Sequence, residues 1–334
     1  MKGVKMPEDI KAIDIMNYPH YFLPEERMRM FSTYEWKIGF KSTFKPFGNP
    51  EIAAKKLGLN SFEELLKEAD DCGYEKVFIT ALKQWSIVNS NWVVNVNIDM
   101  VQDFVKRGKG KIVGCVGYDP LRIEDSLREI DKAVKEYGFK YIYIHPQGFG
   151  LPPTDRRYYP AYVKALEYGV PIGFQSGHSA ESMPSDPGRP MYIDEIAIQW
   201  PSVNFVLSHT GWPWVDEWMD MVWKHPNVYG DISAYPPRAM PDKEKIFAFI
   251  DSWKGQDKVM FGSNSLGMKA CKEQFMALEL KEDTKRKILI LQIFGFQING
   301  VGMKAFVPTP SLFNRGLLVV TCKMAEKGEP QLIS

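Results

Sequence analysis

Cysteine is scarce in this sequence, and the few cysteines that occur lie far apart. Four are present in 334 residues, and no two of them form a CxxC pair: Cys72, Cys115, Cys271 and Cys322. Zinc knuckles and disulfide-stapled folds need cysteines at close, regular spacing. The spacing therefore argues against both classes and predicts reduced, mostly buried thiols.

The sequence also lacks an excess of charge of either sign and a long apolar run. Its formal net charge is +1, which gives no electrostatic footprint for a nucleic acid or an acidic partner. No stretch approaches the roughly 18 apolar residues of a membrane span. The first residues, MKGVKMPEDI, contain no apolar core of a signal peptide. We therefore expect a cytoplasmic protein without nucleic-acid or membrane partners.

The sequence does contain a regular alternation of β-rich and helical runs. Helical periodicity is found at 61–73, 123–138, 158–169 and 191–200. Strands separated by helices of this length imply parallel βαβ units. Eight short runs are predicted as strands: KAIDIM (11–16), KVFIT (76–80), KIVGCVGY (111–118), FKYIYIH (139–145), VPIGFQ (170–175), VNFVLSH (203–209), NVYGDIS (227–233) and KVMFGSN (258–264).

Eight such units predict an α/β fold of the (β/α)8 TIM-barrel type, for which about 250 residues is typical. The alternative is a doubly wound sheet, but no GxGxxG follows the first strand. Residues 21–60 form a long excursion after strand one, and we expect them to be a lid or insertion over the barrel mouth.

We expect the barrel to occupy residues 1–300. Residues 301–334 are predicted to form an irregular C-terminal extension that packs on the barrel or on a neighbouring subunit. Apolar runs that end near residues 296 and 320 need a partner surface, which favours a homodimer or a higher homo-oligomer.

Polar side chains gather where the predicted strands end, which is the rim that carries the active site in this fold. Three of the five histidines map to this rim, whereas His20 follows strand one and His225, in KHPN, is expected at the surface. The residues that fall on the rim are Asp14, Met16 and Tyr18; His145; Gln175, Ser176 and His178; His209; Asp231, Ser233 and Tyr235; and Ser263 and Asn264.

Four runs carry a resemblance to a known family: YIHPQGFGLPPTDRRYYPAYVKALEYGVPI, SVNFVLSHTGWPWVDE, HPNVYGDISAY and KVMFGSN. In order and spacing, the chain resembles the amidohydrolase-related proteins of the aminocarboxymuconate semialdehyde decarboxylase and γ-resorcylate decarboxylase branch. The resemblance implies a barrel built for metal-assisted hydrolysis, or for decarboxylation of small, often aromatic, carboxylic acids. It further implies a divalent ion held by a His-x-His at strand one, a His at strand five and an Asp at strand eight, with a strand-six His as acid or base.

This chain departs from the family pattern at each metal-ligand position. The His-x-His pair falls on Met16 and Tyr18, the strand-five histidine on Gln175 and the strand-eight aspartate on Asn264. A thioether, a phenol and two carboxamides are poor ligands for zinc or manganese, and a carboxamide cannot serve as a general base. We therefore predict no bound metal and no cofactor. Only the strand-six histidine, His209, is retained.

The remaining polar side chains suggest a substrate site without a metal. We expect His209 to act as acid or base, with His178 and His145 as further catalytic candidates. Each has a structural alternative, as a core histidine, a solvated loop residue or a group that orients a loop. Asp14 could instead be a salt-bridge partner beneath the mouth. The predicted substrate contacts are Asp14, Tyr18, Arg157, Gln175, Trp212, Tyr235 and Asn264.

These residues predict a metal-independent hydrolase of the lactone or ester type, or a carboxy-lyase, that acts on a small cyclic or aromatic carboxylic acid. Loss of a metal removes several kcal/mol of charge stabilisation, so the substrate must be intrinsically activated. The alternative is a catalytically silent barrel that binds a ligand or a partner. A mouth that keeps its polar groups favours the enzyme, because a decayed pocket is expected to fill with apolar side chains.

Overall fold

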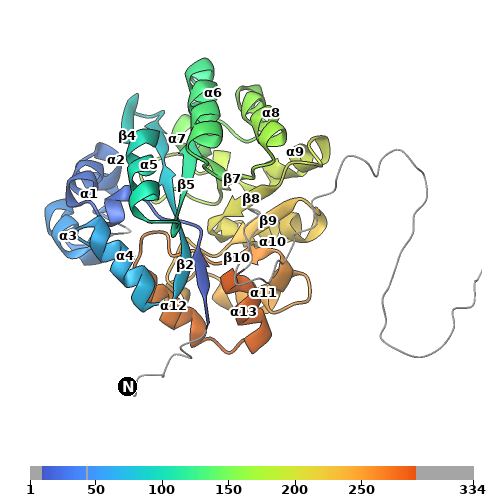
Figure 1. Cartoon of the computed structure of the whole chain (residues 1–334). Helices are drawn as coiled ribbons and strands as arrows, with labels where there is room; N and C mark the ends of the chain where they lie inside the picture. Colours follow the sequence, from blue (N-terminus) through green and yellow to red (C-terminus); the bar gives the residue numbers. More distant parts are fainter. Residues whose placement is uncertain (1–9, 43, 291–334) are drawn as a thin grey trace, which may run out of the picture.

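The computed structural model describes residues 10–42 and 44–290 (Figure 1). Within these residues, eight parallel strands form one sheet in the order β1-β2-β5-β6-β7-β8-β9-β10. All eight predicted strands are confirmed, with ends trimmed. The strands are β1 (Ala12–Asp14), β2 (Tyr74–Ala81), β5 (Ile112–Gly117), β6 (Tyr141–Ile144), β7 (Ile172–Gln175), β8 (Phe205–Ser208), β9 (Val228–Asp231) and β10 (Val259–Met260).

The sheet curls until its two outer strands, β1 and β10, meet (Figure 1). Just beyond these strands, the Ile15 N–H donates to the Phe261 carbonyl oxygen at 3.3 Å. The Ser263 N–H donates to Asp14 Oδ1 at 2.9 Å. These bonds join the edges, so the architecture is the predicted (β/α)8 barrel and the doubly wound alternative does not apply.

Helices connect the strands, and most of them lie outside the barrel (Figure 1). They are α1 (Pro24–Phe31), α2 (Tyr34–Gly39), α3 (Pro50–Lys56), α4 (Phe62–Asp71), α5 (Ile98–Arg107), α6 (Ile123–Asp131), α7 (Pro146–Phe149), α8 (Tyr159–Tyr168), α9 (Ile193–Gln199), α10 (Val215–Lys224), α11 (Lys243–Ile250), α12 (Met268–Met276) and α13 (Glu282–Ile290). The four predicted helices correspond to α4, α6, α8 and α9. No helix of the described residues is long and apolar enough to cross a membrane.

The start of α4 shows how the sequence sets a helix boundary. The Ser61 hydroxyl accepts the Glu64 N–H at 3.1 Å, as an N-cap does. The Glu64 carboxylate turns back to the Asn60 N–H at 2.9 Å rather than to that of Ser61. The arrangement is therefore a capping box shifted by one residue on its carboxylate side.

The barrel is filled by large side chains. Tyr141 and Tyr143 on β6 are fully buried, and their rings lie 6.2 Å apart. A Cβ at Gly173, on the neighbouring strand β7, would lie 1.8 Å from the Tyr141 phenol oxygen. Glycine at this position is therefore required by the close approach of a tyrosine.

The predicted insertion after β1 folds into α1, α2 and α3. Its organising residue is the buried Arg27, whose guanidinium donates to the carbonyl oxygens of His20, Tyr21, Ala54 and Leu59. A buried charge is costly unless it is fully hydrogen-bonded. These bonds fasten the beginning of the insertion to its end.

A hairpin after β2 is absent from the sequence prediction. Strand β3 (Lys83–Ser86) pairs antiparallel with β4 (Asn91–Asn95) in a separate sheet. Ile87, the residue after β3, donates its N–H to the Gly148 carbonyl oxygen of α7 at 2.8 Å, which ties the hairpin to the helix after β6. The hairpin and the insertion therefore both reach the end of the barrel at which the strands terminate (Figure 1).

Two further predictions can be compared with the structure. His225 was expected at the surface, which is wrong: it is 5% exposed, and its Nε2 lies 2.7 Å from Asp194 Oδ1 on α9. Cys72, Cys115 and Cys271 are free, as predicted. Cys322, the barrel boundary at 300 and the extension at 301–334 lie outside the described residues.

Candidate functional site

His209 is the centre of a hydrogen-bonded chain at the ends of two neighbouring strands. It follows β8 directly, and its Nδ1 lies 2.7 Å from the Ser233 hydroxyl oxygen. Ser233 follows β9 and donates its own proton to Asp231 Oδ1 at 2.5 Å. The same carboxylate oxygen accepts the His209 N–H at 3.1 Å and the Ser233 N–H at 3.0 Å. One buried carboxylate thus orients both the ring and the backbone of the histidine.

This chain determines the tautomer of His209. Because the Ser233 proton goes to Asp231, the serine oxygen accepts from the imidazole, so Nδ1 carries the ring proton. Nε2 is then left with a lone pair, and it has no hydrogen-bond partner among the described residues. Burial lowers the pKa of His209, and the charges of Asp231 and Glu181 act in the opposite direction. The ring is accordingly neutral at pH 7 and able to accept a proton at Nε2.

The backbone at His209 is in an uncommon conformation. His209 has a φ of 75° and Thr210 a φ of 57°, both in the left-handed region. Residues that are not glycine adopt this region at a cost of about 1 to 3 kcal/mol each. The bond from the His209 N–H to Asp231 helps to hold it there. Two such residues in sequence at a strand end are a further indication of a functional site.

Met16 and Tyr18 lie on the β1 side of the mouth, at the positions where the resemblance implies metal ligands. Both are buried, and the Tyr18 hydroxyl donates to the Met16 sulfur at 3.1 Å. The Tyr18 ring stacks on His20 at 5.2 Å. Burial raises the pKa of Tyr18 well above its ordinary value, so the phenol stays protonated. A protonated phenol bonded to a thioether is not a donor pair for zinc or manganese.

The other two family positions carry amides. Gln175 ends β7 and is half-buried, and Asn264 lies beyond β10 with a φ of 51°. In the described part of the chain, no group of three or more His, Cys, Asp or Glu side chains could hold a metal ion. The residues present at this mouth therefore do not fit the metal that the resemblance implies.

Asp14 lies beneath the mouth as a hydrogen-bond acceptor. Its Oδ1 accepts the N–H groups of Met16 at 3.2 Å and Ser263 at 2.9 Å. None of the ion pairs among the described residues includes it. Burial raises the pKa of Asp14 from 3.8 to about 6, although these hydrogen bonds oppose the rise. The bonds tie β1 to the end of β10, which indicates a structural role.

His145 is buried at the end of β6, where it caps the short helix α7. Its Nδ1 accepts the Gly148 N–H at 3.1 Å. Its Nε2 lies 3.1 Å from the nitrogen of the Gln84 side-chain amide. Burial lowers the pKa of His145 to about 4. With Nδ1 bonded to the Gly148 backbone, His145 is better suited to fixing the loop than to transferring protons.

His178 contacts two of the predicted aromatic residues, Trp212 and Tyr235. Its ring lies edge-on to the Trp212 ring, with the centroids 4.7 Å apart, and its backbone N–H donates to the Trp212 carbonyl oxygen at 2.8 Å. Its Nε2 lies 3.4 Å from the Tyr235 hydroxyl. Burial lowers the pKa of His178 and raises that of Tyr235 to about 12. The structure thus brings these three predicted residues together.

Arg157 is paired within its own loop. Its Nε and Nη2 donate to the two carboxylate oxygens of Asp155, each at 2.8 Å. This is the fork geometry in which an arginine binds a carboxylate. The guanidinium is thus already occupied, and a substrate would have to displace Asp155.

Three residues at the mouth were missed or left without a role by sequence reasoning. Ser233 and Asp231 were placed on the rim, but nothing in the sequence showed that they bond to His209. Glu181, in the loop after β7, was not singled out, yet its charge raises the pKa of His145, His178 and His209 against the effect of burial. Its carboxylate accepts the Ser179 hydroxyl at 2.6 Å.

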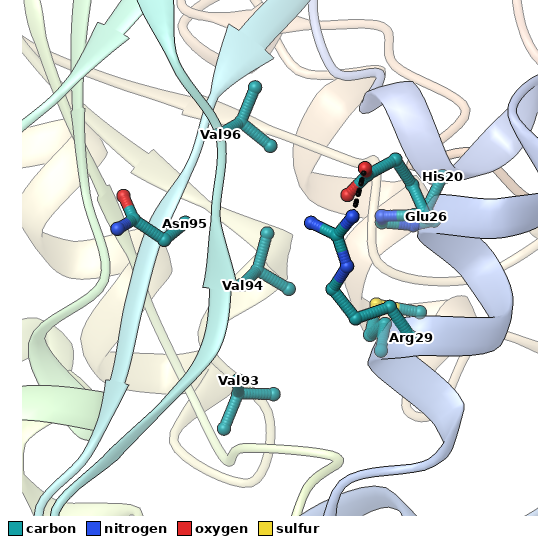
Figure 2. Close-up of a pocket in the computed structure, with 8 residues that line it drawn as sticks. His20, Glu26, Arg29, Val93, Val94, Asn95 and Val96 are labelled. Carbon is teal, nitrogen blue, oxygen red and sulfur yellow. Dashed lines mark ion pairs between the residues drawn. The ribbon is translucent and has the colours of Figure 1, made fainter.

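A small hollow lies beside the mouth, between the insertion and the hairpin. Figure 2 shows the ion pair of Arg29 and Glu26 on α1 facing the valines of β4, while Asn95 points away. The hollow is partly open to solvent. His20, which stacks on Tyr18, also lines it. The hollow between the insertion and the hairpin therefore borders the β1 side of the mouth.

Comparison with known proteins adds a family and a set of structural neighbours. A sequence model of the amidohydrolase family matches residues 79–291. Among solved structures, the chain is similar to an uncharacterised TIM-barrel protein from Bordetella bronchiseptica, with 22% identity, a TM-score of 0.67, and coverage of 84% of this chain and 95% of that chain. No curated protein matches the chain.

Decarboxylases are among the structural neighbours. The 5-carboxyvanillate decarboxylase from Sphingomonas paucimobilis has 11% identity and a TM-score of 0.59, with coverage of 84% of this chain and 96% of that chain. The 2,6-dihydroxybenzoate decarboxylase from Rhizobium has 13% identity and a TM-score of 0.58, with coverage of 83% and 95%. At these identities, the likeness establishes the barrel fold.

Proposed function

The chain belongs to the amidohydrolase family, and from this premise we propose that it is a metal-independent hydrolase of lactones or esters, or a carboxy-lyase, with His209 as the acid–base residue. Its membership in this enzyme family confirms the predicted resemblance. The substrate class, a small cyclic or aromatic carboxylic acid, is supported by the names of two structural neighbours, which act on 5-carboxyvanillate and 2,6-dihydroxybenzoate.

The observation that carries the proposal is the chain from Asp231 through Ser233 to His209. It holds the imidazole in one tautomer with Nε2 free, which is what a general base requires. A carboxylate that orients a histidine in this way also stabilises the imidazolium once it forms. A histidine retained only for packing would not need this arrangement.

Hydrolysis follows directly from the neutral ring. Nε2 takes a proton from water as the water oxygen adds to the carbonyl carbon of a lactone. The proton then passes to the departing ring oxygen as the C–O bond breaks. Gln175 and Asn264, at the ends of β7 and β10, would donate hydrogen bonds to the negative charge that develops on the carbonyl oxygen.

Decarboxylation needs the protonated ring. As the bond to the leaving carbon dioxide breaks, its electron pair stays on the ring carbon, which takes a proton from the imidazolium at Nε2. Because burial lowers the pKa of His209, this form is the minor one at neutral pH. The structure therefore favours the hydrolase of the two reactions, and the carboxy-lyase would work best at acidic pH.

A silent, ligand-binding barrel is the second candidate, and the Met16–Tyr18 contact supports it. These two buried side chains fill the place where relatives hold a metal. A silent barrel would bind small carboxylic acids without converting them. Turnover, measured separately from binding, distinguishes the two candidates.

The test compares two buried histidines of the same chain. His209→Gln and His225→Gln are assayed against a panel of lactones and hydroxyaromatic acids, with ring opening and carbon dioxide release measured separately. We expect His209→Gln to lower kcat/KM by at least about 100-fold. His225→Gln loses only its bond to Asp194 and should keep its turnover. Equal turnover by His209→Gln and the unmodified chain would remove His209 from the mechanism.

A further inference from the structure

Loops from three strands meet at His178, and two of them contain the hydrogen-bonded chain of His209. Trp212 comes three residues after His209, and Tyr235 comes two residues after Ser233. The His178 ring lies edge-on to the Trp212 ring. Its Nε2 lies 3.4 Å from the Tyr235 hydroxyl oxygen. His178 therefore connects the ends of β7, β8 and β9 on the rim that carries His209.

The backbone around His178 holds its imidazole in place. The His178 N–H donates to the Trp212 carbonyl oxygen at 2.8 Å, and the N–H of the preceding Gly177 donates to the Gly188 carbonyl oxygen, also at 2.8 Å. Gly177 has a φ of 86°, and a Cβ there would lie 2.4 Å from the Trp212 carbonyl oxygen. Only glycine tolerates so close an approach in this conformation. The loop that carries the ring is thus packed against the segment that follows His209.

The contacts of His178 determine where its ring proton lies. Its Nδ1 is buried and has no hydrogen-bond partner among the described residues. A proton on Nδ1 would therefore be a buried donor without an acceptor, and such donors are rarer than unpaired acceptors. With the proton on Nε2, the ring donates to the Tyr235 oxygen instead. His178 accordingly serves as a donor that orients the phenol.

Tyr235 then has a hydroxyl proton to donate. In the part of the chain that the structure describes, its hydroxyl bonds to no group besides His178. Burial raises the pKa of Tyr235 to about 12, so the phenol is protonated at neutral pH. Arg157, another predicted substrate contact, is held by Asp155. The half-buried Tyr235 hydroxyl is thus a donor on this rim that is left for a ligand.

We propose that Tyr235, oriented by His178, binds a substituent oxygen on the ring of the substrate. The inference rests on the proposed function, in which His209 works at the reacting carbonyl group. The substituent is a hydroxyl or a carboxylate, since both accept a hydrogen bond from a phenol. The Trp212 ring beside His178 offers an aromatic surface for the substrate ring. Tyr235 is thus a specificity-determining residue, and His178 is its positioning residue rather than an acid or base.

The test compares lactones that share one ring system: dihydrocoumarin, and its derivatives with one hydroxyl or one carboxylate at each position of the aromatic ring. Their Kd is measured by calorimetry in His209→Gln, which should hold lactones without opening them, with and without Tyr235→Phe. We expect Tyr235→Phe to weaken the binding of a hydroxy or a carboxy derivative by about 10-fold. It should leave the binding of dihydrocoumarin within about twofold. The derivative that loses affinity identifies the oxygen.

Matched variants separate recognition from packing. Tyr159→Phe is the control, because the Tyr159 hydroxyl also lies 3.4 Å from its partner, Gln199 Oε1, and it should leave every Kd unchanged. His178→Ala should lose the same discrimination as Tyr235→Phe. His178→Gln, whose amide can donate from the position of Nε2, should keep most of it. In the Tyr235→Phe background, His178→Ala should cause no further loss.

Equal losses for dihydrocoumarin and its derivatives, no loss for any of them, or no binding of any lactone would overturn the inference. Additive losses from His178→Ala and Tyr235→Phe would remove the positioning role of His178. Failure of the proposed function has a different signature: His209→Gln then opens the lactones as fast as the unmodified chain does. The comparison of Tyr235→Phe with Tyr159→Phe is in that case made on kcat/KM.

Discussion

The two sides of the barrel mouth differ in what their side chains can do chemically. On the β8–β9 side, His209, Ser233 and Asp231 form a continuous chain of short hydrogen bonds around a buried carboxylate. On the β1 side, Met16 and Tyr18 bond to each other and leave no metal donor. One side thus orients an imidazole with Nε2 free, whereas the side chains of the other side do not suit a divalent metal.

The largest expected effect comes from restoring the β1 side. A variant that combines Met16→His, Tyr18→His, Gln175→His and Asn264→Asp rebuilds the family's ligand set. Three imidazoles and a carboxylate suit zinc, so we expect this variant to hold about one ion per chain after dialysis, a gain in affinity of at least about 1,000-fold. A control that keeps Met16 and Tyr18 should bind far less. Stoichiometric metal in the unmodified chain, treated in the same way, would contradict the account.

Two serine variants, one on each side of the mouth, allow the two sides to be compared directly. Ser233→Ala removes the link between Asp231 and His209, so the imidazole is no longer held with Nε2 free, and we expect kcat/KM to fall by about 100-fold. Ser263 lies on the β1–β10 side, where its hydroxyl contacts Asn17 at 3.3 Å. Ser263→Ala should change kcat/KM by less than about threefold. Equal losses in the two variants would erase the distinction between the sides.

A smaller effect concerns the pH dependence of stability at Asp14. Its pKa rises from 3.8 to about 6 on folding, so its contribution to stability is fully present below pH 3.8 and is lost as the pH rises through 6. At 1.4 kcal/mol per unit, the loss amounts to about 3 kcal/mol. The stability of Asp14→Asn relative to that of the unmodified chain should therefore rise by about this much from pH 4 to pH 8. Urea unfolding of both proteins at the two pH values measures the difference.

Asp155 provides a control of opposite sign for this prediction. Its pKa is lowered by Arg157, so its contribution is present above its ordinary pKa and is lost as the pH falls. Asp155→Asn should consequently lose stability relative to the unmodified chain as the pH rises from acidic values. A stability difference for Asp14→Asn that does not change with pH would show that its carboxylate is not strained by burial.

The barrel itself could be predicted from the sequence because each strand is a short apolar run between helical segments. The hairpin of β3 and β4 could not, since residues 83–95 contain no two-residue turn motif between two alternating runs. His225 was misplaced because KHPN has the composition of a turn. Its burial depends on Asp194, which comes from α9.

The site could be predicted only in part, because its geometry also depends on tertiary contacts. Strand ends place His209, Asp231 and Ser233 on one rim, but the hydrogen bonds among them depend on the register of β8 against β9 and on the left-handed backbone at His209. Glu181 lies in a loop whose position is set by tertiary contacts with Gln147 and Trp212. Sequence patterns do not record such contacts.

The most direct test of the account is the turnover of chelator-treated protein whose metal content has been counted. The unmodified chain is stripped, analysed for zinc and manganese, and assayed on the lactone or hydroxyaromatic acid that it converts. We predict that the stripped, unmodified chain keeps full turnover although its metal content is substoichiometric. His209→Gln should abolish this turnover. Turnover that disappears on chelation and returns with added zinc or manganese would contradict the central claim that His209 works here without a metal.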